Sequence, residues 1–412
     1  MSTNYYDIII IGSGIAGLYS AFNIKQMAHQ TSFLVLEKYK KQWIGGRLNN
    51  EEFYGTTVVT GAGIGRKEKD HLLVHLLDKL NIKYTEFPVN INYEMLLSGN
   101  NETMSIPSVI RDLRKEYKKQ NNPVTTFKNF AKPYLGDRRY KQFITTSGYT
   151  DYENEDVYQT LYKYGMDDNN SGWTGLSIPW HQLIQKLVTV IGSEHVRSSN
   201  NVVSIVPNKE GGFEIITEKG NNYTCGKVII ATTITSIHKL LPQFKIYNKI
   251  KPQPFLRLYA KFPKKSADIM KQFVPTYTVV MGPLQKIIPM SIENGVYMIA
   301  YSDNKSAEML KDHLENNSKN RQFFCDLLEE TLDIPKNTLK ITALLDFYWP
   351  VGTHYYTPLN HTLREEFIDK AQHPMPNMLV VGEVVAANQG WTEGALDSVK
   401  RVLTKTWINS AI

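Results

Sequence analysis

The sequence contains few cysteines and no long apolar run. Cys225 and Cys325 are the two cysteines among 412 residues, so we expect neither a disulfide framework nor a metal site, and a reducing, cytoplasmic location is predicted. No apolar stretch approaches the roughly 18 residues of a membrane helix. Residues 1–6 show no basic or apolar leader pattern, so neither a membrane anchor nor secretion is expected.

A strong excess of charge of one sign is also lacking. The 47 Lys and Arg residues face 40 Asp and Glu residues, and the lysines occur singly or in pairs. Nucleic-acid-binding proteins usually concentrate basic residues on one face, so nucleic acid is not an expected partner. With 42% hydrophobic and 21% charged residues, the composition is that of a globular protein of two or three domains.

Periodicity predicts a βαβ unit at the start of the chain. A strand is expected over Tyr6–Ile11, a helix over Ile15–Gln26 and a second strand over Ser32–Glu37. Between the first strand and the helix lies Gly12-Ser13-Gly14-Ile15-Ala16-Gly17, which is a GxGxxG pattern in the context typical of dinucleotide binding. Further helices are predicted over Asp70–Ile82, Ile106–Gln120, Ala307–Leu332 and Thr392–Asn409, and strands over Phe255–Phe262, Val296–Ser302, Ile341–Trp349 and Asn377–Gly382.

Each glycine of this turn has a separate predicted task. Gly12 permits the tight turn, Gly14 lets a pyrophosphate approach backbone N–H groups at the positive helix end, and Gly17 lets helix and strand pack closely. Glu37 follows Gly17 by 20 residues, where a carboxylate accepts hydrogen bonds from an adenosine ribose. The segment therefore predicts a dinucleotide cofactor.

Two further glycine-rich segments follow the βαβ unit. Gly45-Gly46-Arg47 combines flexible backbone with a fixed positive charge suited to a bound cofactor. Thr60-Gly61-Ala62-Gly63-Ile64-Gly65 offers backbone without Cβ atoms, against which a flat ring can lie.

With these residues, the sequence resembles the flavin-dependent amine oxidase family, which includes monoamine, polyamine and L-amino-acid oxidases. The family's GGR motif matches residues 45–47, although the preceding loop, 38–44, is about two residues longer than usual. Gly390-Trp391-Thr392-Glu393-Gly394-Ala395 is similar to the closing G-aromatic-x-E-G-A run that passes the flavin. Residues 195–205 resemble the segment whose valine backbone, here Val203, contacts adenine, and Glu383 resembles the acidic residue beside the ribityl chain.

The resemblance implies FAD as cofactor and an α/β fold. A doubly wound, Rossmann-like FAD-binding domain would comprise residues 1–66, 172–240 and 370–412. An inserted α+β substrate domain with a mainly antiparallel sheet would comprise 67–171 and 241–369, with the active site between the domains. The implied FAD-binding residues are Gly12, Gly14, Ile15, Ala16, Gly17, Glu37, Lys38, Gly46, Arg47, Gly61, Ala62, Gly63, Ile64, Val203, His354, Gly382, Glu383, Gly390, Trp391, Thr392 and Ala395.

The resemblance also implies catalytic residues. Trp391 and Tyr355 would form the aromatic wall of the substrate site, with Tyr356 one residue away in register; alternatively, they pack the domain junction. Arg257 falls where many relatives carry a lysine. Because a guanidinium stays protonated in proteins, Arg257 would donate hydrogen bonds rather than act as a base; alternatively, it is a structural strand residue.

The sequence does not decide the roles of three further charged or titratable features. His354 is expected to hydrogen-bond rather than to attach the flavin covalently. Arg66 is a candidate for a substrate carboxylate. The acidic run Asp151–Asp156 either forms a solvated loop or attracts a polyamine at the entrance.

The leading hypothesis is an FAD-dependent amine oxidase. It would convert an amine, possibly a polyamine or an amino acid, to an imine by hydride transfer to flavin N5, with O2 reoxidising the flavin to give H2O2. The alternatives are an FAD-dependent desaturase or dehydrogenase acting on C–C bonds, and a flavin-binding interaction protein without turnover.

Overall fold

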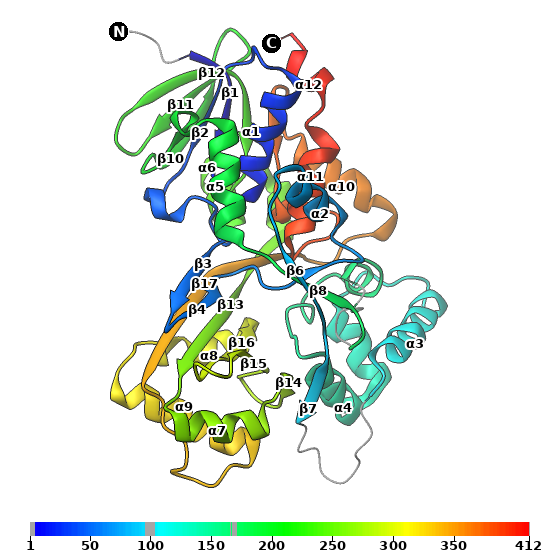
Figure 1. Ribbon diagram of the computed structural model, residues 1–412. Coiled ribbons are helices and arrows are strands. Elements are labelled where there is room, and N and C mark those ends of the chain that lie inside the picture. Colours follow the sequence, from blue (N-terminus) through cyan, green and yellow to red (C-terminus); the bar gives the residue numbers. More distant parts are fainter. Residues whose placement is uncertain (1–4, 95–103, 165, 167–170, 412) are drawn as a thin grey trace.

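The computed structural model describes residues 5–94, 104–164, 166 and 171–411, and within them two large sheets organise the chain (Figure 1). The first sheet has seven strands in the order β10-β11-β12-β1-β2-β9, with β18 also paired to β12. Its central strands β18, β12, β1 and β2 are parallel. The strands are β1 (Tyr5–Ile11), β2 (Phe33–Leu36), β9 (Val196–Arg197), β10 (Val202–Pro207), β11 (Phe213–Thr217), β12 (Asn222–Ile230) and β18 (Met378–Val380).

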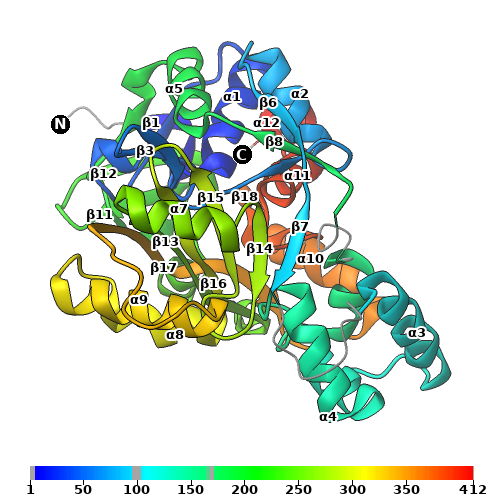
Figure 2. The ribbon, with the colours of Figure 1, turned by 60° about the horizontal axis from the view of Figure 1, so that its bottom comes forward.

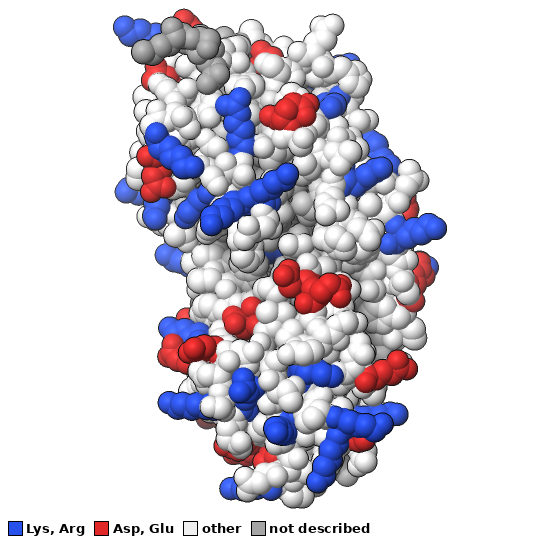
Figure 3. All heavy atoms as spheres, turned by 60° about the vertical axis from the view of Figure 1, so that its left-hand side comes forward, with Lys and Arg blue, Asp and Glu red and all other residues white. Residues whose placement is uncertain are grey.

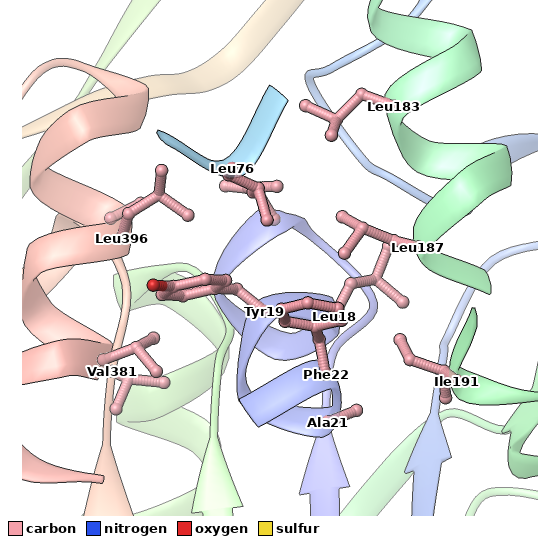
Figure 4. Close-up of a cluster of buried hydrophobic side chains, with 14 of the residues drawn as sticks. Leu18, Tyr19, Ala21, Phe22, Leu76, Leu183, Leu187, Ile191, Val381 and Leu396 are labelled. Atoms are coloured by element: carbon pink, nitrogen blue, oxygen red, sulfur yellow. The ribbon is translucent and has the colours of Figure 1, made fainter. Parts of the chain in front are cut away.

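Both faces of this sheet are covered, which explains the continuous apolar character of its strands. In β1, Ile8 and Ile10 belong to one buried cluster, whereas Ile9 and Ile11 belong to another. The first cluster packs against α1 (Ile15–Met27), α2 (His71–Lys79), α5 (Trp180–Ile191) and α11 (Thr392–Val402) (Figure 4). The second packs against α6 (Ile234–Leu240) and α10 (Arg364–Gln372). The predicted doubly wound α/β fold is therefore confirmed.

The second sheet is mainly antiparallel, as predicted. Its order is β17-β13-β16-β15-β14-β7, and β7 and β14 are parallel. The strands are β7 (Ile91–Glu94), β13 (Ile250–Lys261), β14 (Tyr277–Val280), β15 (Lys286–Ser291), β16 (Val296–Asp303) and β17 (Ala343–Tyr356). Helices α7 (Lys264–Phe273), α8 (Asn304–Leu310) and α9 (Ser318–Leu332) cover one face (Figure 2). The hairpin of β3 (Asn50–Phe53) and β4 (Thr56–Val59) covers part of the other face.

A helical unit and a small sheet complete the fold. Helices α3 (Ile106–Lys119) and α4 (Phe127–Ser147) and the π-helical segment Gln159–Tyr164 share their own aromatic-rich cluster. The small sheet pairs β8 (Thr174–Ser177) with β5 (Gly65–Arg66) and β6 (Thr85–Pro88). In Figure 1 this small sheet lies between the first sheet and the helical unit.

Several predicted element boundaries are wrong, including the start of β13, which is Ile250 rather than Phe255. The helix expected over 307–332 is two helices, α8 and α9, and the Asn317 side chain caps the second. The helix expected over 392–409 likewise ends at Val402, and Thr404 caps α12 (Lys405–Asn409). The strand expected to end at Trp349 continues to Tyr356, because β17 lies at the sheet edge, where Pro350 can be accommodated without a backbone N–H.

On the face shown in Figure 3, basic and acidic side chains are interspersed rather than gathered into one basic patch. Among the described residues, no helix has the length and apolar character needed to cross a membrane.

Candidate functional site

A cavity of about 1530 Å³ is lined by strands of the second sheet and, on the side of the first sheet, by the start of α1 and by segments outside the strands. The first sheet's side contributes Ile15, Arg47 and Glu383, and the second sheet contributes Phe255, Arg257 and Tyr301. The loop 61–64 and the segment 390–395, which includes the first turn of α11, also line it. The sequence predicted that both segments meet the flavin. The predicted residues that line the cavity are Ile15, Arg47, Gly61, Ala62, Gly63, Ile64, Arg257, Glu383, Gly390, Trp391, Thr392 and Ala395.

The glycine turn before α1 leaves a cradle that fits a pyrophosphate. A Cβ at Gly12, where φ is +105°, would lie 2.4 Å from the Ala231 carbonyl oxygen, and one at Gly17 would lie 1.9 Å from the Gly12 oxygen. A Cβ at Gly14 would meet nothing within 4 Å. No side chain caps the N-terminus of α1, so its N–H groups suit an anion in that open space.

Glu37 ties the end of β2 to this turn. Its Oε2 accepts hydrogen bonds from the Ser13 backbone N–H at 2.9 Å and from the Ser13 hydroxyl at 2.7 Å. The GGR segment also contacts the turn, because the Gly45 N–H donates to the Ser13 carbonyl at 2.9 Å. Gly382 lies nearby, where its Cβ would stand 3.7 Å from Ala16. The residues around the turn thus fit the adenosine and pyrophosphate of FAD.

Glu383 is buried at the centre of a hydrogen-bond network. Its Oε1 accepts from the backbone N–H groups of His354 at 2.9 Å and Gly390 at 2.8 Å, and its Oε2 lies 2.5 Å from His354 Nδ1. Arg47 Nη1 lies 3.7 Å from Oε2 and also donates to the Gly352 carbonyl. Burial alone would raise the pKa of Glu383, but the His354 imidazole and the Arg47 guanidinium outweigh it and hold the pKa below its ordinary value.

Asp70 holds the Trp391 indole in place and was missed by sequence reasoning. Trp391 Nε1 donates to Asp70 Oδ2 at 2.8 Å, and Trp391 also packs edge-on against Trp180, with ring centroids 6.1 Å apart. Asp70 is fully buried. Its Oδ1 accepts from Arg66 Nη2 at 2.8 Å, so Arg66 is already paired with a carboxylate, which disfavours its predicted role toward a substrate carboxylate. The one local sign of its importance was its position, since Asp70 is an acidic residue directly before an amphipathic helix.

Other supporting residues were missed as well. Glu393 of the closing motif accepts hydrogen bonds from the N–H groups of Leu72 and Leu73, so it caps α2. The indoles of Trp180 and Trp349 donate to the carbonyls of Gly63 and Thr60, which fixes the loop expected at the flavin.

Arg257 is 3% exposed and lines the cavity. Its guanidinium carbon lies 3.4 Å from the Tyr301 ring centroid and 4.7 Å from that of Phe255. Its Nε and Nη1 have no hydrogen-bond partner among the described residues. The predicted strand arginine therefore reaches the cavity.

The structure does not bring Tyr355 to the cavity. Among the described residues, β17 contributes Gly352 and Thr353 to the lining. Tyr355 lies two residues further along the strand and is not part of the lining. Tyr356 is fully buried and its hydroxyl donates to the Ala386 carbonyl. The expected pairing of Trp391 with a tyrosine of this segment is therefore not seen in the lining.

Several other predicted residues lie away from the cavity lining. Val203 is 47% exposed, at an irregularity in the pairing of β10 with β11, and Lys38 is exposed. The acidic run divides: Asp151 lines the cavity, whereas Glu155 and Asp156 are buried. The expectation of a solvated loop is wrong for those two residues, because they hydrogen-bond within the protein to Thr160 and to the Leu359 N–H.

The two-sided α/β sheet, its open glycine turn and the adjoining cavity define a dinucleotide-binding protein. The family described as flavin containing amine oxidoreductase matches residues 15–402, and the chain belongs to this family. It is an FAD-dependent oxidoreductase.

Solved structures agree with this fold. A double mutant of putrescine oxidase from a redesign of cofactor binding has a TM-score of 0.75 at 14% identity, covering 98% of this chain and 99% of that one. Cyclohexylamine oxidase from Brevibacterium oxydans IH-35A has a TM-score of 0.75 at 15% identity, covering 98% of each chain. Wild-type putrescine oxidase bound to putrescine has a TM-score of 0.74 at 12% identity, covering 96% of this chain and 98% of that one. Comparison with curated proteins gives no match.

Proposed function

We propose that this protein oxidises an amine to an imine, with O2 as the electron acceptor and H2O2 as the second product. The observation that carries the proposal is the continuity of the cavity. It connects the loop 61–64 and the segment 390–395 to a wall of apolar and aromatic side chains from the second sheet, including Ile288, Met290 and Met298. A substrate on this wall would lie beside the flavin.

The chain's own residues would bind and orient the amine. FAD, when bound, supplies an acceptor for the hydride equivalent at N5. The apolar wall favours the neutral amine, because removing an ammonium from water is costly. The Trp391 indole, fixed by Asp70, would hold the substrate in one orientation, which increases the fraction of productive encounters.

We further propose that residues 1–66, 172–240 and 370–412 form the FAD-binding domain and that 67–171 and 241–369 form the substrate domain. Gly14 and the N-terminus of α1 would hold the pyrophosphate, Glu37 the ribose, and Arg47 and Glu383 the region near the ribityl chain. We expect that FAD is not attached through His354, because Nδ1 of that ring contacts Glu383 and Nε2 accepts the Ile234 N–H at 3.1 Å. Acid precipitation of the holoenzyme should therefore release the flavin into the supernatant, unless another residue holds it covalently.

Anaerobic mixing with candidate substrates tests the activity. The purified holoenzyme is mixed with cyclohexylamine, putrescine and a panel of amino acids, and flavin absorbance is followed before air is admitted and peroxide is measured. Bleaching by an amine followed by peroxide formation supports the proposal. Bleaching only by a donor without an amine would instead support chemistry on C–C bonds, and flavin that no small donor reduces would contradict turnover.

A further inference from the structure

Arg257 is a buried cation without a counter-ion of its own. Its Nε and Nη1 are enclosed and have no hydrogen-bond partner in the described part of the chain, and no ion pair is formed with a described carboxylate. Burying an unpaired charge is costly. The nearby aromatic rings of Tyr301 and Phe255 offset part of this cost but leave the in-plane N–H groups unsatisfied.

The arginine is also placed beside the predicted flavin loop. Its third nitrogen, Nη2, lies 4.0 Å from the position of a Cβ on Gly63, and both residues line the cavity. An anion bound by Arg257 would therefore lie beside the loop that is expected to meet the flavin. A carboxylate attached to the carbon that bears the amine would fit such a position.

The wider cavity also favours an anionic group. Its described lining contains eight Lys and Arg residues against six Asp and Glu residues, so acidic residues are not in excess among the lining residues that the structure describes.

We propose that Arg257 is the carboxylate-binding residue of the substrate site, and that the substrate is an amino acid with an apolar side chain. The carboxylate would accept a hydrogen bond from Nη2 of Arg257, since Nε and Nη1 are enclosed, and the charge of the whole guanidinium would attract it. The side chain would lie against Ile288, Met290 and Met298, which line the cavity from β15 and β16. This inference rests on the proposed amine oxidase function and names its substrate class.

The test measures binding without turnover. The holoenzyme is titrated with 4-methylpentanoate and with the uncharged 4-methylpentanamide, and binding is followed by calorimetry and by the flavin spectrum. We expect the carboxylate to bind at least tenfold more tightly than the amide, because a charge-assisted hydrogen bond contributes about 1.5–3 kcal/mol. Arg257→Gln should abolish the preference, and Arg257→Lys should retain only part of it.

Arg114→Gln is the matched control. Arg114 also lines the cavity, but its Nε already donates to the Leu161 carbonyl at 2.7 Å, so we expect less than a threefold change in carboxylate binding. If Arg257→Gln fails to fold, Arg257→Lys still tests the inference, because its preference for the carboxylate over the amide should be smaller than that of the wild type.

Two results would overturn the inference: a wild-type enzyme without carboxylate preference, or an unchanged preference in Arg257→Gln. A lowered flavin reduction potential in that variant with unchanged carboxylate binding would assign the guanidinium to the reduced cofactor instead. Flavin bleaching by cyclohexylamine without any carboxylate preference would leave the proposed function standing while this inference fails. If the protein prefers the carboxylate but no amine reduces its flavin, Arg257 binds a carboxylate while the proposed oxidase function fails.

Discussion

His354 Nδ1 lies 2.5 Å from Glu383 Oε2, and both side chains are buried. Because His354 Nε2 accepts the Ile234 N–H, the ring is the neutral tautomer with its proton on Nδ1. Glu383 thus receives a hydrogen bond from the histidine, and its fixed positive neighbour is Arg47 at 3.7 Å. The histidine connects β17, the first turn of α6 and the loop after β18.

Replacing His354 should weaken both folding and cofactor binding. His354→Phe would leave the Glu383 Oε2 and the Ile234 N–H without this partner, so we expect a loss of about 3 kcal/mol in the free energy of unfolding. FAD affinity should fall as well, because Glu383 would no longer be held beside Arg47. Urea unfolding and flavin titration measure the two effects. His75→Phe, at an exposed position of α2, should change stability by less than about 0.5 kcal/mol, and equal losses in both variants would contradict the argument.

Two substitutions at Trp391 separate its hydrogen bond from its ring. Trp391→Phe removes the N–H donated to Asp70 but keeps an aromatic surface, so it should cost about 1 kcal/mol and retain most activity. Trp391→Ala also removes the contact with Trp180, and we expect kcat/KM to fall at least tenfold, which corresponds to about 1.4 kcal/mol. Steady-state peroxide production measures activity. Similar kcat/KM values for the two variants would exclude the ring as a substrate contact.

Local signals predicted the first sheet and its glycine turn well. The apolar run of β1 and the spacing of Gly12, Gly14 and Gly17 are short-range features, and each follows from the requirements of one strand or one turn. The broken helices were predicted less well, because apolar periodicity continues across the interruptions at Asn317 and Thr404, which cap the helices that follow.

The supporting residues of the site required tertiary knowledge. Trp391 and Asp70 are 321 positions apart in the sequence, and nothing local to either residue indicates their hydrogen bond. For Tyr355 the local sequence was misleading. An aromatic residue was expected in the cavity lining, but the position of Tyr355 along β17 lies beyond the residues of that strand that line the cavity. A one-residue or two-residue difference along a strand decides which side chains reach a cavity.

Glu155 should make stability depend on pH in a defined direction. Burial raises the pKa of its carboxyl well above the ordinary value of 4.5, so the folded state retains a proton that the unfolded chain releases. This contribution to stability is fully present below about pH 4.5 and is lost as pH rises toward the folded pKa, by at most about 1.4 kcal/mol per pH unit.

Glu155→Gln tests that dependence, because the amide oxygen can still accept the Thr160 hydroxyl hydrogen bond, which is 2.8 Å long in the native protein. The variant should gain stability over the wild type as pH increases from 5 to 8, as measured by urea unfolding. Glu51→Gln, at an exposed position, is the control for the loss of one carboxylate. A Glu155→Gln variant that loses stability relative to the wild type with increasing pH would show that the carboxylate is stabilised in the folded state.

Gly14 and Gly17 form a matched pair that tests the cofactor site. A Cβ at Gly14 meets no atom within 4 Å, whereas one at Gly17 lies 1.9 Å from the Gly12 oxygen. Gly14→Ala should therefore leave the apoprotein as stable as the wild type but reduce FAD affinity at least tenfold, because the new methyl group occupies the space intended for the pyrophosphate. Gly17→Ala should destabilise the fold itself by about 3 kcal/mol. Thermal unfolding of apoprotein and flavin titration distinguish the two, and full FAD affinity in Gly14→Ala would place the pyrophosphate elsewhere.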